Sequence, residues 1–366
     1  MNQPEMRRKL VQMSMDKQDV LVVESGQEVL RNGDANYRFR ANSDFLYLTG
    51  ITEPNCALVI TMNSQILLVR AKDRKQEMWH GARLGITQAR KQTGIDSVYN
   101  IESSSYKAAY KTTKGMLEIV HQMRSVKDST EIRNMCISAD IAMTAHHRAM
   151  RMSTFKESEN SIQAIFDGKF TSAGVEHSYT PIVAGGVNAL CLHYIANNQK
   201  LEAGTMLLID AGCEYEGYAS DITRTFPVDG KFGTQEADIY QVVLEANKEA
   251  IKLVGPGVTM SDIDSLAREI ITQGMKSLGF KSKNGYFPHG TSHFLGLDVH
   301  DVGDRHAPLE VGNVITVEPG AYVKELGLGI RIEDDILVTV DGNINLTEGL
   351  AKEISEIEEV ILCPLT

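Results

Sequence analysis

Two aspartates lie at or near the ends of apolar segments, where an isolated charge is costly. Residues 206–209 are all apolar and lead directly into Asp210, and Asp221 follows eleven residues later. The apolar run predicts a strand buried on both faces, and residues 214–217 can turn the chain back. In such a hairpin the two carboxylates lie side by side and repel each other, so a cation between them would relieve the repulsion.

The same arrangement recurs further along the chain with two glutamates. The mostly apolar residues 314–317 lead into Glu318, the alternating segment 330–333 ends in Glu333, and residues 324–329 can turn the chain between them. For one isolated acid, a buried ion pair or an edge position facing water is the ordinary explanation. Four acids in two hairpins instead predict a metal site, because buried carboxylates need a shared counter-ion.

Histidines supply further candidates for this site. His289 and His293 lie four residues apart among glycines, and His300 follows within the same short segment. A pair of ligands on one helix is one interpretation, but the glycines disfavour a regular helix. A strand or loop that presents one ligand and other polar groups is the preferred alternative. His193 lies shortly before the strand that ends in Asp210.

The elements that must position these residues follow a repeated order in the second half of the chain. Asp128 and Glu131 form a capping-box pattern, which predicts the start of a long helix. A second helix, a strand-rich segment, two more helices and another strand-rich segment follow, with the third helix ending before the glycine and proline at residues 255–257. The order helix-helix-strands therefore occurs twice, and this suggests an internal pseudo-duplication.

The first half of the chain has a different character. The pattern predicts strands at residues 20–23, 57–61 and 65–69, and a loop that leads into a further strand at 45–48. We expect an α/β domain over residues 1–118 and a second domain over residues 119–366. Residues 101–114, which are rich in Ser, Tyr and Lys, are assigned to the connection between them.

Composition limits the classes of partner. The 366 residues are 42% hydrophobic and 23% charged, which is typical of a folded globular chain, and the formal net charge is −11. An acidic excess argues against nucleic acid or an anionic membrane as a partner. Apolar runs are much shorter than the ~18 residues of a membrane span. Five cysteines without a CxxC pair fit a reducing compartment, so we expect a cytoplasmic location.

An ordered set of motifs resembles a known family, the pita-bread metallopeptidases, which include aminopeptidase P, prolidase and methionine aminopeptidase. The matching segments of the second half are 192–194, 209–212, 221–227, 289–293, 299–301, 317–320 and 331–335. Residues 42–50 resemble the signature of the family's N-terminal domain. This resemblance implies an α/β N-terminal domain followed by an α+β pita-bread catalytic domain with pseudo-twofold helix-helix-strand halves.

The resemblance also implies a centre with two divalent metal ions. Its proposed ligands are Asp210 for one ion, Asp221 and Glu333 as bridges, and His293 with Glu318 for the second ion. Four carboxylates and one imidazole, without a thiolate, form a hard site that suits manganese, with cobalt, iron or zinc as alternatives.

Roles for the remaining residues follow from this resemblance. A hydroxide bridging the metals would attack the peptide carbonyl, with Glu318 carrying the proton to the leaving amine. His193 and His300 would hydrogen-bond the substrate and the tetrahedral intermediate. Arg331 is expected to orient the acids, and Tyr322 and His289 are weaker candidates for lining the pocket, with simple strand packing as the alternative for Tyr322.

Residues 211–227 most resemble aminopeptidase P, which removes the first residue of a peptide when proline is second. The expected function is therefore a proline-specific metallo-aminopeptidase. Prolidase, which cuts Xaa-Pro dipeptides, is the first alternative, and a non-catalytic pita-bread module that binds peptides is the second. The resemblance further implies a homodimer or homotetramer. In it, Trp79 either reaches a neighbouring subunit's pocket or packs in its own domain.

Overall fold

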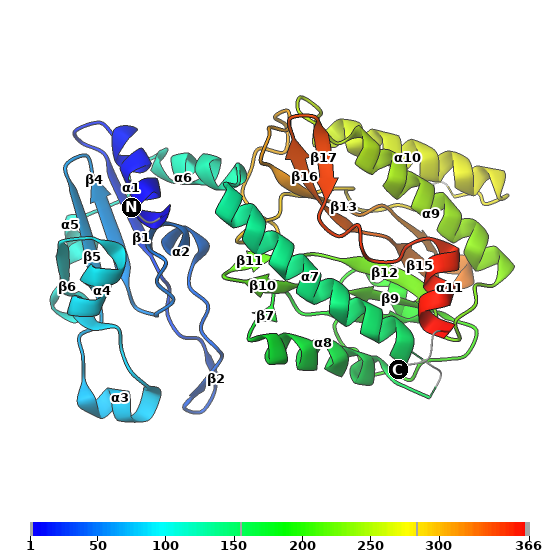
Figure 1. Ribbon diagram of the computed structural model, residues 1–366, viewed down its shortest axis with the longest axis horizontal. Coiled ribbons are helices and arrows are strands. Elements are labelled where there is room, and N and C mark those ends of the chain that lie inside the picture. The colour runs from blue at the N-terminus through cyan, green and yellow to red at the C-terminus, as the bar shows by residue number, and fades with distance from the viewer. Residues whose placement is uncertain (1–2, 154–155, 283–284, 363–366) are drawn as a thin grey trace. The chain divides into compact units, whose positions relative to one another are not determined.

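The computed structural model describes residues 3–153, 156–282 and 285–362 (Figure 1). The chain divides into two compact units, Met1–Arg124 and Ser125–Thr366. The division therefore lies six residues beyond the boundary expected at residue 118. Helix α6 (Met116–Ser125) accounts for the difference, because Val120 is fully buried and Arg124 forms a 2.7 Å ion pair with Asp44 of the first unit.

A mixed sheet forms the centre of the first unit. Its strands lie in the order β1 (Val20–Glu24), β4 (Ala57–Thr61), β5 (Ser64–Val69) and β6 (Ser97–Asn100). The first two pairings are antiparallel and the last is parallel. This unit also contains α1 (Gln3–Met13), β2 (Leu30–Asn32), β3 (Ala35–Asn36), α2 (Ser43–Thr49), α3 (Arg74–His80), α4 (Gly85–Thr93), the 3-10 helix η1 (Ile101–Ser103) and α5 (Tyr106–Ala109). The α/β character expected for this half is confirmed.

Two local expectations for this unit were wrong. Residues 45–48 form part of helix α2 and not a strand, because the Asn42 side chain caps the helix and Gly50 ends it at φ +66°. Residues 101–114 belong to the first unit and do not connect the two units. The Thr112 hydroxyl exchanges two 3.0 Å hydrogen bonds with the backbone of Val22, which closes the free edge of β1.

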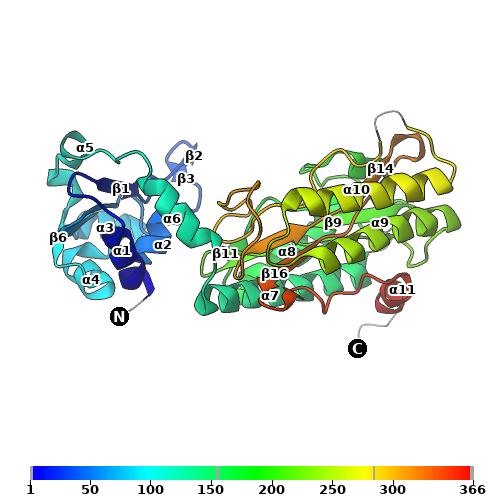
Figure 2. The ribbon, with the colours of Figure 1, turned by 90° about the horizontal axis from the view of Figure 1, so that it is seen from above.

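Two helix pairs flank the strands of the second unit. Helix α7 (Ser129–Met152) packs against α8 (Glu159–Ala173), and α9 (Thr234–Leu253) packs against α10 (Met260–Ser277), as Figure 2 shows for the latter pair. The predicted capping box at Asp128 and Glu131 is present at the start of α7. A final helix, α11 (Ile354–Leu362), lies against α7.

The strands of the second unit pair in an antiparallel manner throughout the described segments. One sheet has the order β12 (Thr223–Pro227), β9 (Met206–Asp210), β8 (Ile182–Gly185), and another has β13 (Val314–Val317), β16 (Asp334–Thr339), β17 (Gly342–Asn345). The smaller sets are β14 (Gly320–Val323) with β15 (Leu328–Arg331), and β11 (Tyr218–Ala219) with β10 (Cys213–Tyr215) and β7 (Glu176–His177). Both helix pairs contribute to one continuous apolar core with these strands.

Two surface features bear on the earlier expectations. Within the described segments, no helix combines the length and the apolar character needed to cross a bilayer. Trp79 lies on α3 with 77% of its surface exposed, so it does not pack into the core of its own unit.

Candidate metal centre

The hairpin expected between the two aspartates is present, with an inner hairpin added at its tip. Strand β9 ends at Asp210 and pairs with β12, in which Thr223 lies opposite Asp210. Between them β10 and β11 form a tight turn at Glu216 and Gly217, whose φ angles of 52° and 83° suit a two-residue hairpin loop. The predicted turn at residues 214–217 is therefore confirmed.

The second predicted hairpin places the two glutamates opposite each other. Strands β14 and β15 pair with Gly320 opposite Arg331. Continuing this register by two residues brings Glu318 opposite Glu333. At this point the Glu333 N–H donates at 3.0 Å to the Thr223 carbonyl, which lies on the other hairpin. This bond joins the glutamate hairpin to the aspartate hairpin.

Side chains from both hairpins and from the histidine segment meet in one buried cluster. Oxygen or nitrogen atoms of Asp221, His293 and Glu333 all lie within 4.8 Å of one another, and all three residues are buried. The His293 Nε2 atom lies 3.4 Å from Asp221 and 3.6 Å from Glu318. Asp210 completes the group from the end of β9, where Arg331 donates to it at 2.7 Å.

A cavity of about 200 Å³ opens onto this cluster. Nine of the ten residues predicted for the site line the cavity: His193, Asp210, Asp221, His289, His293, His300, Glu318, Arg331 and Glu333. Sequence reasoning did not propose four other lining residues: Leu192, Gly290, Ser292 and Arg305.

Tyr322 is the exception among the predicted residues, because it is not one of the side chains that line the cavity. Its hydroxyl accepts a hydrogen bond from Arg331 at 2.8 Å and lies 2.8 Å from His289 Nε2. Tyr322, a weaker candidate for lining the pocket, therefore contacts two residues that do line the cavity, Arg331 and His289.

The orientation of His293 suits a ligand. Its Nδ1–H donates to the Phe294 carbonyl at 2.9 Å, which leaves Nε2 directed at the carboxylates. The segment that carries His289 and His293 is irregular and not helical, as preferred from its glycines. The His300 ring packs edge-on against that of His293, with 4.3 Å between the centroids.

Crowding of carboxylates in a buried place shifts their pKa values. Burial raises the pKa of Asp210 to about 6 and that of Glu318 to about 7. The pKa of Glu333 is raised well above its ordinary range by burial and by the charges of Asp221 and Glu318. Burial also acts to raise the pKa of Asp221, but the hydrogen bond and charge of His293, together with Tyr179 and Arg331, outweigh it and the pKa is lowered.

These shifts show that the cluster has a deficit of positive charge. Arg331 and His293 face four carboxylates, and three of the four hold a proton more tightly than an ordinary acid does. Divalent cations would supply the missing charge, and oxygen-rich donors with one imidazole are a suitable set for hard or borderline metals. The residues present therefore fit a metal centre.

Polar side chains that are not proposed ligands hydrogen-bond to the acids of the centre and orient them. The Arg331 Nε–H donates to the Thr223 hydroxyl at 3.0 Å, and that hydroxyl donates to the Glu333 carboxylate at 2.6 Å. Tyr179 donates to Asp210 at 2.5 Å. Neither Thr223 nor Tyr179 was proposed from the sequence. Thr223 carried a signal, because side chains two residues apart in an extended segment point to the same side and Thr223 lies two residues after Asp221, whereas Tyr179 carried none.

Comparison with known proteins decides the family. The model of metallopeptidase family M24 matches residues 133–340, and that of the aminopeptidase P N-terminal domain matches residues 5–115. The chain belongs to metallopeptidase family M24. Its expected fold, an N-terminal domain followed by a pita-bread catalytic domain, is confirmed.

Relatives of this M24 chain match it along almost its whole length. It is 36% identical to the Xaa-Pro aminopeptidase of Haemophilus influenzae, covering 98% of this chain and 96% of the relative. Human Xaa-Pro aminopeptidase 3 is 33% identical, covering 93% of this chain and 80% of the relative. The structure of zinc-substituted Escherichia coli aminopeptidase P in complex with product superposes with a TM-score of 0.93 at 33% identity, over 98% of both chains.

Proposed function

We propose that this protein is an Xaa-Pro aminopeptidase, a metallo-hydrolase that removes the first residue of peptides whose second residue is proline. The buried meeting of Asp221, His293 and Glu333 beside Glu318 and Asp210 carries the proposal. Support also comes from relatives of that activity whose similarity covers both units of the chain.

The centre would hold two divalent ions, most suitably manganese, with cobalt, iron or zinc as alternatives. Asp210 would bind one ion, Asp221 and Glu333 both, and His293 with Glu318 the other. When bound, such ions lower the pKa of water and polarise a carbonyl group. The 4.8 Å span of the three central ligand atoms supports this assignment.

Glu318 is the proposed proton carrier. Its side chain keeps 18% of its surface exposed, against 7% for Asp221, so it has access to the cavity. One oxygen lies near His293 and the other lies 3.5 Å from His289 Nδ1. A carboxylate held in this way can accept a proton from the attacking water at the free lone pair of one oxygen. It can then deliver that proton to the leaving amine nitrogen.

Histidines at the cavity wall would bind the substrate. His193 and His300 both line the cavity, and we propose that they hydrogen-bond the carbonyl oxygen on which negative charge develops. Arg331 acts differently, because its guanidinium is engaged by Asp210, Thr223 and Tyr322. Its proposed role is to orient Asp210 and, through Thr223, Glu333.

A substrate series tests the proposal. Purified protein, loaded in turn with Mn²⁺, Co²⁺ and Zn²⁺, is assayed on an Xaa-Pro-Xaa tripeptide, the Xaa-Pro dipeptide and the matched Xaa-Ala-Xaa tripeptide. We expect cleavage of the first bond of the proline tripeptide and little cleavage of the alanine one, because the proline imide lacks an N–H and has a fixed φ. Cleavage of the dipeptide alone would indicate prolidase instead. No hydrolysis with any metal would favour a peptide-binding module.

Assembly and location are also part of the proposal. We propose a cytoplasmic homodimer or homotetramer in which the exposed Trp79 lies at a subunit contact. Light scattering on the wild type and on Trp79→Ala measures the mass of the assembly. A monomeric wild type, or an unchanged assembly and unchanged peptide KM in the variant, would contradict this part.

A further inference from the structure

One buried amide joins the backbones of the two glutamates in the centre. Asn247, on α9, is fully buried, and its Nδ2 group donates to the Val317 carbonyl at 3.1 Å and to the Ile332 carbonyl at 3.4 Å. These residues come immediately before Glu318 and Glu333 in the chain. Asn247 therefore bridges the two strands at the points where each presents its acid.

Both peptide planes are also held at their other ends. The Glu318 N–H donates to the Thr291 carbonyl at 2.9 Å, and the Glu333 N–H donates to the Thr223 carbonyl at 3.0 Å. Because a peptide unit is planar, a hydrogen bond to its carbonyl and another from its N–H together set the direction in which the next Cα lies. Asn247 supplies the carbonyl bond for both planes.

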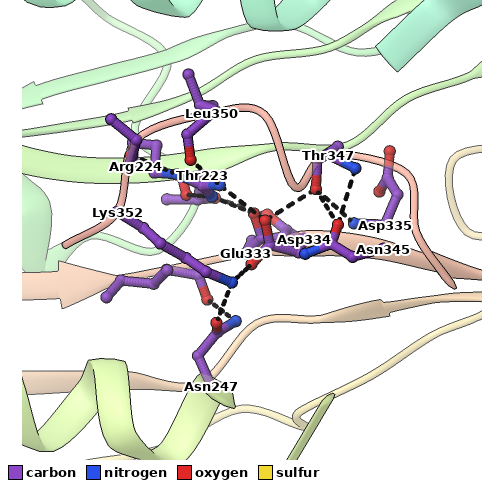
Figure 3. A network of polar contacts seen from close by, with 12 residues as sticks. Thr223, Arg224, Asn247, Glu333, Asp334, Asp335, Asn345, Thr347, Leu350 and Lys352 are labelled. Atoms are coloured by element: carbon purple, nitrogen blue, oxygen red, sulfur yellow. Dashed lines mark hydrogen bonds and ion pairs between the residues drawn. The ribbon is translucent and has the colours of Figure 1, made fainter. Parts of the chain in front are cut away.

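Lys352 fixes the orientation of this amide (Figure 3). Its ammonium donates to the Asn247 Oδ1 at 3.0 Å and to Asp334 at 2.7 Å. An amide whose oxygen accepts from a cation keeps its NH₂ group on the opposite side, toward the two carbonyls. The lysine side chain is 16% exposed and the Asp334 side chain is fully buried, so the charge pair is shielded from water.

Arg224 closes the network on the far side of Glu333. It forms a 2.7 Å ion pair with the other oxygen of Asp334 and donates to the carbonyls of Glu333 and Thr223 at 2.5 and 3.0 Å. The carbonyls of Ile332 and Glu333 are therefore both held by one connected set of polar and charged groups. In Figure 3 these groups lie together around Glu333 and Asp334.

We infer that Asn247 and Lys352 are positioning residues that set the placement of Glu318 relative to Glu333 and thereby the affinity of the centre for divalent metal. The inference rests on the ligand assignment of the proposed function. Neither residue lines the cavity or is a proposed ligand. Metal sites require their ligands within a few tenths of an ångström, so outer groups of this kind commonly change metal affinity when they are removed.

A pair of matched asparagine variants tests this inference. Asn343 also donates both amide hydrogens to backbone carbonyls, those of Ile251 at 2.8 Å and Val254 at 2.9 Å, but these lie at the end of α9 and neither is adjacent in the chain to a proposed ligand. Isothermal titration of metal-stripped protein with Mn²⁺ should show about 10- to 100-fold weaker binding for Asn247→Leu and unchanged binding for Asn343→Leu.

Thermal unfolding with and without Mn²⁺ separates positioning from general stability. Asn247→Leu should reduce the rise in Tm that Mn²⁺ produces, whereas a merely structural role would lower the Tm of both forms equally. Lys352→Met retains the side-chain stem and removes the ammonium, and it should weaken Mn²⁺ binding in the same direction. It carries the test alone if Asn247→Leu does not fold.

Three outcomes would be decisive. Wild-type Mn²⁺ affinity in Asn247→Leu or, where that variant does not fold, in Lys352→Met would overturn the inference. A wild-type protein that binds no Mn²⁺ would overturn it together with the ligand assignment. A wild type that binds Mn²⁺ but leaves Xaa-Pro peptides intact would overturn the proposed function alone, and the comparison of variants would still decide the inference.

Discussion

Glu333 is the least exposed of the four acids in the centre. It is 2% exposed, accepts a hydrogen bond from Thr223, and lies within the cluster with Asp221 and His293. We expect Glu333→Ala to abolish peptide hydrolysis, because in the proposed centre Glu333 would be shared by two cations and no neighbouring side chain could replace it. Mn²⁺ titration and a peptide assay on the same preparation measure the two losses.

Glu325→Ala is the matched control for this change. Glu325 lies on the same β14–β15 hairpin but is exposed at its tip, so its removal should alter neither Mn²⁺ binding nor turnover. Substantial turnover by Glu333→Ala would show that Glu333 is not a bridging ligand.

His146 is a buried base outside the centre. Its Nε2–H donates to the Ala211 carbonyl at 2.9 Å, next to Asp210, and its ring packs edge-on against Phe166. Burial lowers the pKa of His146 to about 3. In the native state His146 therefore stays neutral down to about pH 3. In the unfolded chain it would bind a proton below about pH 6.5.

The sign of the pH effect follows from this difference. Where the unfolded state binds more protons, the free energy of unfolding falls as the pH falls, by up to about 1.4 kcal/mol per pH unit for one group. We expect wild-type Tm to drop between about pH 6.5 and pH 4 and His146→Gln to drop less steeply. His306→Gln, at an exposed position, should keep the wild-type slope. Equal slopes for His146→Gln and wild type would refute the assignment.

At the scale of elements, one helix holds the loop that carries His193. Glu159, at the start of α8, is fully buried. Its two carboxylate oxygens accept four hydrogen bonds, from the Gly185 N–H, the Asn188 amide, the Tyr194 hydroxyl and the Gln199 N–H, at 2.8–2.9 Å. Residues on both sides of His193 are therefore attached to α8 by one side chain.

Glu159→Gln should loosen this loop, because a glutamine places an NH₂ group where an acceptor is needed. We expect kcat/KM for a proline tripeptide to fall about 10- to 100-fold from misplacement of His193. Mn²⁺ affinity should be unchanged, since Glu159 contacts none of the proposed ligands. A parallel loss of Mn²⁺ affinity would instead indicate a general structural role.

The two helix pairs also correspond in detail. His146 on α7 and Asn247 on α9 are each six residues from the last residue of their helix, Met152 and Leu253. Each donates to a backbone carbonyl directly beside a proposed ligand, Ala211 in one half and Val317 or Ile332 in the other. This equivalence supports the internal duplication that the order of elements suggested.

At the scale of the whole molecule, metal and stability should be linked. Ions that bind only the native state stabilise it, by about 2.7 kcal/mol at a free concentration one hundred times the Kd. We expect metal-stripped protein to have a lower Tm, and Mn²⁺ to restore it at two equivalents per chain. Calorimetry combined with elemental analysis measures both quantities. A Tm that does not respond to Mn²⁺, or a chain without bound metal after loading, would contradict a two-metal centre.

The sequence by itself predicted the repeated helix-helix-strand order and three of the four strands in the main sheet of the first unit, and nine of the ten residues that it predicted for the site line the cavity. Those features follow from local patterns: apolar runs ending in an acid, the capping box at Asp128, and histidines among glycines. Residues 45–48 were predicted as a strand from their composition. They are helical because the Asn42 side chain caps the helix and Gly50 ends it.

Only the tertiary structure decided which polar groups support the acids. Asn247 is separated by 70 and 85 residues from the carbonyls that it joins, and Lys352 by 105 residues from Asn247. In the sequence Asn247 is an unremarkable polar residue in a helix, and Lys352 resembles any surface lysine. Their significance arises from burial and from partners distant in the chain, and neither helical periodicity nor motif spacing carries information about such contacts.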